Sequence, residues 1–128
     1  MIDLTLVVTI LIAHFIADFV MQSDEMAKGK STCNIWLFLH VLVYIIVLYF
    51  SLRGYAEYIQ DTISPTGYIF GWAVLNGIAH FITDYFTSRW TSSLWKQGRT
   101  HDFFVVIGLD QCIHTITLFT TAYWLLQG

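Results

Sequence analysis

Four apolar stretches, each about 20 residues long, set the strongest limit on how this 128-residue chain can fold. They run approximately over residues 4–21, 35–52, 68–86 and 103–126, and each could form a helix that crosses the hydrocarbon core of a bilayer. Among open elements, only helices satisfy all their backbone hydrogen bonds in lipid. We therefore predict an all-α fold, an integral membrane four-helix bundle that forms one domain over residues 1–128.

The composition agrees with a membrane environment. Hydrophobic residues make up 56% of the chain and charged residues 12%, whereas soluble domains carry about 25% charged residues. The net charge of −3 and the lack of a basic stripe argue against a nucleic-acid partner and leave the lipid bilayer as the expected one. The first stretch lacks a preceding basic segment and carries His14 and Asp18, so we expect a membrane helix rather than a cleaved signal peptide.

Positively charged residues cluster in the connections that follow the first and third stretches. Five of the six Lys and Arg residues lie there, whereas Arg53 alone lies in the second connection. Because cytoplasmic loops carry the excess of Lys and Arg, we predict that these two connections are cytoplasmic and that both termini are outside. The five residues are Lys28, Lys30, Arg89, Lys96 and Arg99.

Two of the stretches contain nearly the same eight residues. Residues 12–19 read IAHFIADF and residues 78–85 read IAHFITDY, with six of the eight positions identical. Each is followed by a stretch that carries its own histidine, His40 in one half and His114 in the other. This internal repeat predicts two parallel-repeat helical hairpins, related by a pseudo-two-fold axis along the membrane normal, with a site between them.

Ionisable side chains recur at a spacing of four within the stretches, and residues four apart share one face of a helix. Such groups avoid lipid, so three pairs and the lone His40 are expected to face the bundle interior. With a rise of about 1.5 Å per residue, all seven groups fall toward the side of the first and third connections, where they can meet. The pairs are His14 with Asp18, His80 with Asp84, and Asp110 with His114.

Imidazole and carboxylate groups that converge in an apolar bundle are typical of a metal site. They suit a divalent transition metal, with zinc the first choice and manganese or iron the alternatives. Seven groups exceed what one tetrahedral ion needs, so the pattern allows one ion or two. The expected ligands are His14, Asp18, His40, His80, Asp84 and His114.

Other polar residues are assigned to supporting roles. Asp110 is the predicted general base, although it could equally be a ligand or orient the imidazole with which it is paired. Arg89, Lys96 and Arg99 are placed at the mouth of the site, where they could neutralise a substrate phosphate or act only as interface anchors. Residues expected to hydrogen-bond the ligands are Gln22, Asn76 and Gln111.

The motifs also carry a resemblance to a known family. In chain order they read His-x3-Asp-Phe-x2-Gln, a lone His, His-x3-Asp and Asp-Gln-x2-His. This pattern resembles, over nearly the whole chain, a family of small bacterial and phage membrane proteins catalogued as domain of unknown function 3307. It is more loosely similar to predicted membrane-bound metal-dependent hydrolases. The resemblance implies a multi-pass protein of the bacterial inner membrane. The motifs lie at residues 14–22, 40, 80–84 and 110–114.

The leading functional prediction is a metal-dependent hydrolase that acts on a lipid-linked or membrane-embedded ester or phosphate at the cytoplasmic side. A transporter of divalent metal or protons is the main alternative. A haem bundle with His40 and His114 as axial ligands, and a structural or regulatory protein with a hydrogen-bonded core, are two others. His101 is expected to be an interfacial residue. Small residues that could permit close contact within a monomer or a homo-oligomer are Gly71, Ala73, Gly77 and Ala79.

Overall fold

The computed structural model describes residues 3–59 and 66–127, and within these ranges every regular element is a helix. This confirms the predicted all-α class. The first helix begins behind Asp3, whose carboxylate accepts the backbone N–H of Leu6 at 2.7 Å. The elements are α1 (Leu4–Phe15), which continues as the π-helical turn η1 (Ile16–Val20), then α2 (Asp24–Gly29), α3 (Asn34–Tyr58), α4 (Thr66–Lys96) and α5 (Thr100–Gln127).

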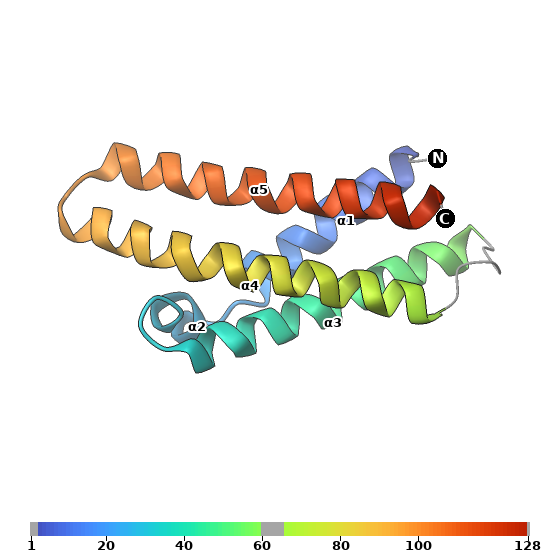
Figure 1. Ribbon diagram of the computed structural model, residues 1–128, viewed down its shortest axis with the longest axis horizontal. Helices are drawn as coiled ribbons and strands as arrows, with labels where there is room; N and C mark the ends of the chain where they lie inside the picture. Colours follow the sequence, from blue (N-terminus) through green and yellow to red (C-terminus); the bar gives the residue numbers. More distant parts are fainter. Residues whose placement is uncertain (1–2, 60–65, 128) are drawn as a thin grey trace.

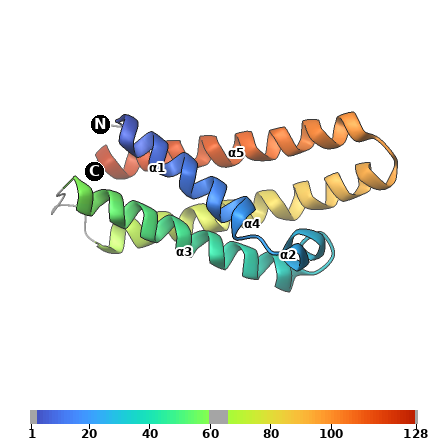
Figure 2. The same cartoon turned by 180° about the vertical axis from the view of Figure 1, so that it is seen from behind.

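The four long helices form an antiparallel bundle (Figure 1). α4 packs against both α3 and α5, and α1 runs obliquely against α3 and α5 (Figure 2). α2 and the turn between α4 and α5 lie at one end, which we call the α2 end. The start of α1 and the end of α5 lie together at the opposite end, which we call the terminal end (Figure 1).

Two of the described helices are long and apolar enough to cross a membrane by themselves. They are Asn34–Tyr58, with a mean hydropathy of 2.4, and Thr100–Leu126, with a mean hydropathy of 1.5. The segment Leu4–Val20 is apolar but shorter, and α4 is not among the candidate spans. Length and composition therefore support two of the four predicted spans.

Two helices continue beyond their predicted ends. α3 ends at Tyr58 rather than at residue 52, and α4 ends at Lys96 rather than at residue 86, so Ser92 lies inside a helix instead of a loop. The chain leaves α4 where Gly98 adopts a φ of 69°, a conformation that favours glycine. The predicted ranges marked only the apolar part of each helix, and α3 and α4 continue into the more polar residues that follow.

The helix α2 replaces part of a predicted loop. Its first turn is capped by Ser23, whose hydroxyl accepts the backbone N–H of Met26 at 3.2 Å. Its last residue, Gly29, lies so close to the indole of Trp36 that a Cβ atom would clash there. The chain reverses after Gly29, and Lys30 reaches back to Asp84 in the bundle.

An apolar core fills the half of the bundle nearer the terminal end, and all four long helices contribute to it. α3 and α4 pack closely at Gly77, where a Cβ atom would collide with the side chain of Ile45. Ala73 is also fully buried, whereas a Cβ atom on Gly71 would meet open space. Two of the four small residues therefore serve contacts inside the bundle. The core includes Leu6, Ile10, Leu48, Leu52, Ile69, Trp72, Leu118 and Ala122.

Candidate metal centre

The backbone of α1 changes its hydrogen-bonding register beside the first His-x3-Asp motif. The N–H of Met21 donates to the carbonyl of Ile16, five residues back, at 2.8 Å, which makes η1 a π-helical turn. His14 lies before this turn and Asp18 lies within it. The two side chains make no direct hydrogen bond to each other, because His14 Nε2 is 3.9 Å from Asp18 Oδ2.

Four buried side chains from η1, α3 and α4 converge in the bundle, at the level where the apolar core ends. One ligand atom from each of Asp18, His40, His80 and Asp84 lies within 4.8 Å of the other three. The Nε2 atoms of His40 and His80 are 3.0 Å apart. Asp18 Oδ1 lies 3.1 Å from the first of these nitrogens and 3.4 Å from the second. Asp84 Oδ2 lies 3.6 Å and 3.5 Å from them.

These five separations match the edges of a coordination tetrahedron. With zinc–ligand distances of about 2.0 to 2.1 Å, tetrahedral geometry places the ligand atoms about 3.3 Å apart. The measured values run from 3.0 to 3.6 Å. A single cation between the four atoms would contact all of them, whereas only one proton can lie between the two imidazole nitrogens. The donor set therefore fits a metal ion.

Ring stacking orients one of these imidazoles. The ring of His80 stacks on Tyr44 and on His114, with a centroid separation of 4.0 Å in each case and interplanar angles of 18° and 30°. The Nδ1 atoms of His40 and His80 have no hydrogen-bond partner within the described ranges. Stacking thus replaces, for His80, the Nδ1 hydrogen bond that usually fixes the orientation of a metal-binding histidine.

His114 extends the centre toward α5. Its Nε2 is 3.5 Å from Asp84 Oδ1, and its Nδ1 is 3.4 Å from Asp110 Oδ2 and 4.0 Å from Asp18 Oδ2. Neither ring nitrogen makes a hydrogen bond to another described residue. Asp110 itself accepts a hydrogen bond of 2.6 Å from the hydroxyl of Thr87. His114, Asp84 and Asp110 form a second group with the spacing of metal ligands.

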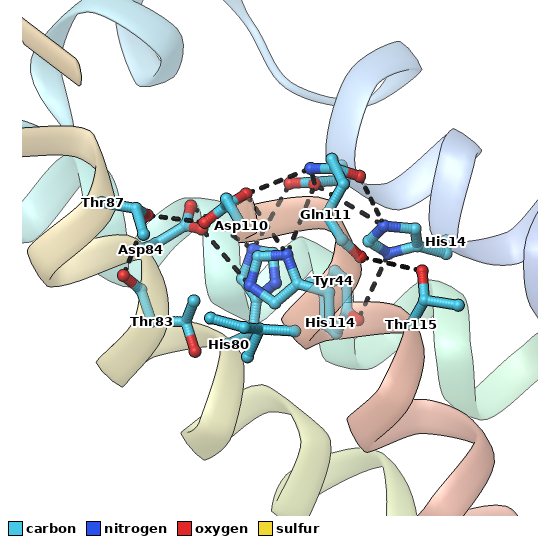
Figure 3. A network of polar contacts seen from close by, with 12 residues as sticks. His14, Tyr44, His80, Thr83, Asp84, Thr87, Asp110, Gln111, His114 and Thr115 are labelled. Atoms are coloured by element: carbon cyan, nitrogen blue, oxygen red, sulfur yellow. Dashed lines mark hydrogen bonds and ion pairs between the residues drawn. The ribbon is translucent and has the colours of Figure 1, made fainter. Parts of the chain in front are cut away.

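Gln111 links the centre to His14 (Figure 3). Its Nε2 donates to Asp18 Oδ2 at 2.8 Å and to Asp110 Oδ2 at 3.1 Å. Its Oε1 lies 2.8 Å from His14 Nε2, which can donate to it. The hydroxyl of Tyr44 lies 3.4 Å from the other nitrogen of the same ring. His14 is thereby placed outside the four-atom group, although it forms a third group of ligand spacing with Asp18 and His114.

Lys30 is a member of the site that the sequence analysis did not identify. Its Nζ donates to Asp84 Oδ2 at 2.8 Å, and the side chains of the two residues are 18% and 1% exposed. Burial alone would lower the pKa of this ammonium group, but the carboxylates of Asp84 and Asp18 outweigh it and raise the pKa. The only sequence signal for Lys30 was its place in one of the two connections toward which the His and Asp groups were predicted to lie.

Two residues expected to support the ligands lie apart from them. Asn76 Nδ2 donates to the carbonyl of Trp72 and to the hydroxyl of Thr121, both at 2.9 Å, on the terminal side of the centre. Gln22 lines a cavity beside the centre, where its buried Oε1 has no hydrogen-bond partner among the described residues.

The three basic residues predicted at the mouth of the site make other contacts. Arg89 donates to Asn34 Oδ1 at 2.8 Å and lies over the ring of Tyr85, 3.8 Å from its centroid. Arg99 pairs with Asp102 at 2.7 Å on the surface. The side chain of Lys96 is exposed. None of these three residues lines the cavity beside the centre.

That cavity adjoins the centre on the side of the α2 end and has a volume of about 170 Å³. The carboxylates of Asp18, Asp84 and Asp110 all line it, together with Lys30 and Gln111. We call it the inner cavity. It is large enough for several water molecules, so a ligand could approach the carboxylates from this side.

Comparison with known proteins identifies a family without an assigned activity. No curated protein and no solved structure matches this chain. One family model, described as a protein of unknown function (DUF3307), matches residues 6–127, and this range contains every residue of the candidate centre. The chain belongs to this DUF3307 family of proteins of unknown function.

Proposed function

We propose that the chain is an integral membrane protein in which all four long helices cross the bilayer. The outward faces of these helices support this placement, because large apolar side chains are exposed on each of them. In the Thr100–Leu126 span only 17% of the most apolar window is buried, unlike the core helix of a soluble domain. Examples of the exposed side chains are Leu11, Phe15, Phe38, Ile46, Phe70, Ile78, Phe86, Leu109 and Ile116.

The proposed orientation places the α2 end in the cytoplasm of a bacterial cell and the terminal end outside its inner membrane. The distribution of positive charge supports it, because five of the six Lys and Arg residues belong to the α2 end or the helix turns beside it.

We propose that the centre binds one divalent transition-metal ion, zinc by preference, through Asp18, His40, His80 and Asp84. The observation that carries this proposal is the set of five separations of 3.0 to 3.6 Å between buried ligand atoms. Hydrogen-bonded core residues without a metal have no need for four-way convergence of this kind.

Charge balance favours a single ion. The carboxylates of Asp18, Asp84 and Asp110 carry three negative charges when ionised, and Lys30 supplies one positive charge beside them. One divalent cation brings the sum to zero, and uncompensated charge in a low-dielectric bundle is costly. A second ion would leave two positive charges, which an anionic ligand would have to neutralise.

We further propose that the centre catalyses hydrolysis of an ester or phosphate bond in a membrane-embedded substrate. A metal ion there would have to accept a water or substrate oxygen in addition to its four protein ligands, and it would then supply Lewis acidity and lower the pKa of the attacking water. Asp110 lines the inner cavity, and Thr87 and Gln111 hold its carboxylate in place, so it is positioned to take the proton of that water. The water oxygen then bonds to the carbon or phosphorus atom while the ester bond breaks and the leaving oxygen gains a proton.

The packing favours this function over transport. A permeation path would need polar groups on both sides of the centre. On the terminal side, however, buried apolar side chains such as Leu6, Leu48 and Leu118 fill the bundle. The cavity beside the centre opens from the α2 side instead.

The test is metal analysis by mass spectrometry of detergent-purified protein, comparing wild type with His40→Ala and His80→Ala. His101→Ala is the matched control, because this histidine is exposed at the start of α5. We expect one equivalent of metal in the wild type and the control, and loss of most of it in the two ligand variants. Wild-type protein that folds but binds no zinc, manganese or iron on reconstitution would refute the metal centre.

A further inference from the structure

A second cavity lies next to the inner cavity, between α2 and the ends of α4 and α5 at the α2 end. Its volume is about 550 Å³, within the range of roughly 300 to 1,000 Å³ typical of small-molecule sites. We call it the outer cavity. Three side chains, Lys30, Ser88 and Thr91, line both cavities, so the two spaces share a wall.

The chemistry of the lining changes from one cavity to the other. The inner cavity is bounded by the carboxylates of Asp18, Asp84 and Asp110. The outer cavity is bounded by two ammonium groups and several hydroxyls, and then by three aromatic side chains. These outer residues include Lys28, Lys30, Ser92, Trp95, Phe103 and Phe104. A ligand that fits this gradient has a negatively charged head and an apolar body.

Two polar groups in the shared wall, one buried and one partly exposed, have hydrogen-bonding capacity to spare. Ser88 is 8% exposed, and its hydroxyl has no partner among the described residues. Lys30 has three N–H donors, of which one is directed at Asp84. It can therefore hold Asp84 and contact an anionic ligand at the same time.

We propose that the outer cavity binds an anionic lipid phosphate, whose phosphate group contacts Lys30, Lys28 and Ser88 and whose chain lies along Trp95, Phe103 and Phe104. This inference rests on the proposed hydrolytic centre, for which it names the substrate class and the residues that recognise it. Lys30 then acts as a positioning residue, because the same ammonium group touches the substrate phosphate and the metal ligand Asp84. The scissile bond is thereby held at the wall of the inner cavity.

The location of the cavity supports a lipid over a soluble phosphate. Aromatic side chains at a membrane interface commonly contact lipid, and the aromatic part of this cavity belongs to the ends of the two helices that form the α4–α5 hairpin. A soluble phosphate ester would use the two lysines but would leave the three aromatic side chains without a ligand.

The test is a titration of the full-length, detergent-purified protein with dioleoyl phosphatidic acid, followed by native mass spectrometry. Lys30→Gln, Lys28→Gln and Ser88→Ala are compared with wild type. Lys96→Gln is the matched control, because this lysine is also at the α2 end but lines neither cavity. We expect affinity to fall about tenfold or more in Lys30→Gln, to fall less in the other two variants, and to stay unchanged in the control.

Two further ligands separate the parts of the proposal. Dioleoylglycerol, which lacks the phosphate, should bind at least tenfold more weakly than phosphatidic acid, and so should glycerol 3-phosphate, which lacks the chains. Equal binding of dioleoylglycerol would overturn the phosphate site. Equal binding of glycerol 3-phosphate would overturn the lipid assignment in favour of a soluble phosphate ester.

Metal analysis of the same samples distinguishes this inference from the proposed function. If wild type holds metal but phosphatidic acid binds equally to all variants, the lipid site is wrong and the metal centre stands. If wild type holds no metal, the hydrolytic centre is wrong, while lysine-dependent binding would still identify a lipid-phosphate site. Ser88→Ala and Lys28→Gln alter no contact of a proposed metal-binding residue. They therefore keep the test valid should Lys30→Gln fail to fold.

Discussion

The Nε2 atoms of His40 on α3 and His80 on α4 lie 3.0 Å apart, and each also faces the carboxylates of Asp18 and Asp84. Helices α3 and α4 pack along each other, so an ion held between these histidines would join the two helices. Metal binding and bundle stability should therefore be coupled.

Removal of the metal should lower the thermal stability of the protein in detergent. At a free metal concentration of 100 times Kd, binding contributes about 2.7 kcal/mol to the folded state. A chelator should thus reduce the unfolding temperature of wild type, and added zinc should restore it. His40→Ala already lacks a ligand, so chelator and zinc should have little effect on it. A chelator effect of equal size in both proteins would contradict the coupling.

His14→Ala should keep the metal content of wild type, in contrast to His40→Ala. The reason is that His14 Nε2 faces Gln111 Oε1 at 2.8 Å and lies outside the four-atom group. Metal analysis of the variant decides the number of ions. Loss of one of two equivalents in His14→Ala would show instead that His14, Asp18 and His114 hold a second ion.

Asp110→Asn should retain the metal but lose hydrolysis. The substitution keeps the size of the side chain and its contact with Thr87, but an amide cannot accept the proton of the attacking water. We expect activity on a lipid phosphate to fall roughly 100- to 10,000-fold. The assay is release of phosphate from phosphatidic acid in mixed micelles, with metal content measured in parallel. Loss of metal together with activity would make Asp110 a ligand rather than the base.

Gly77→Val should destabilise the bundle, whereas Gly71→Val should not. A side chain at Gly77 collides with Ile45 across the contact between α3 and α4, while Gly71 has open space around it. Overpacking of this kind costs about 1 to 3 kcal/mol. Both variants change the intrinsic helix propensity equally, so the difference between their unfolding temperatures isolates the collision. Equal destabilisation would mean that α3 and α4 do not approach closely at Gly77.

Much of the centre could be predicted from the sequence because two properties of the α-helix determine it: the residues that share a face, and the rise per residue. The spacing of four in each His/Asp pair places both side chains on one face, and the low polarity of the stretches makes the bundle interior their only suitable environment. His80 and Asp84 follow this rule on an uninterrupted helix. The rise per residue also placed the groups at a common level, as the convergence of Asp18, His40, His80 and Asp84 shows.

The rest depended on features that residue spacing does not encode. The contact of Lys30 with Asp84 requires the short helix α2 and the close packing of Gly29 on Trp36, which are tertiary contacts. Two of the basic residues expected at the mouth of the site instead contact residues close to them in sequence, as in the ion pair of Arg99 with Asp102. Asn76 shares a helix with two ligands, but it lies one turn nearer the terminal end and hydrogen-bonds there.

Because of the π-helical turn η1, the two nearly identical motifs have different backbone structures. Replacing residues 12–19 by the letters of residues 78–85 would alter just two side chains, Ala17→Thr and Phe19→Tyr, and would leave His14 and Asp18 untouched. Because Ala17 is fully buried, a functional defect in such a chimaera would report on packing around the turn rather than on the chemistry of the ligands. The same motif contributes both of its ionisable side chains to the four-atom group on α4, whereas the first copy contributes only Asp18 and leaves His14 in contact with Gln111.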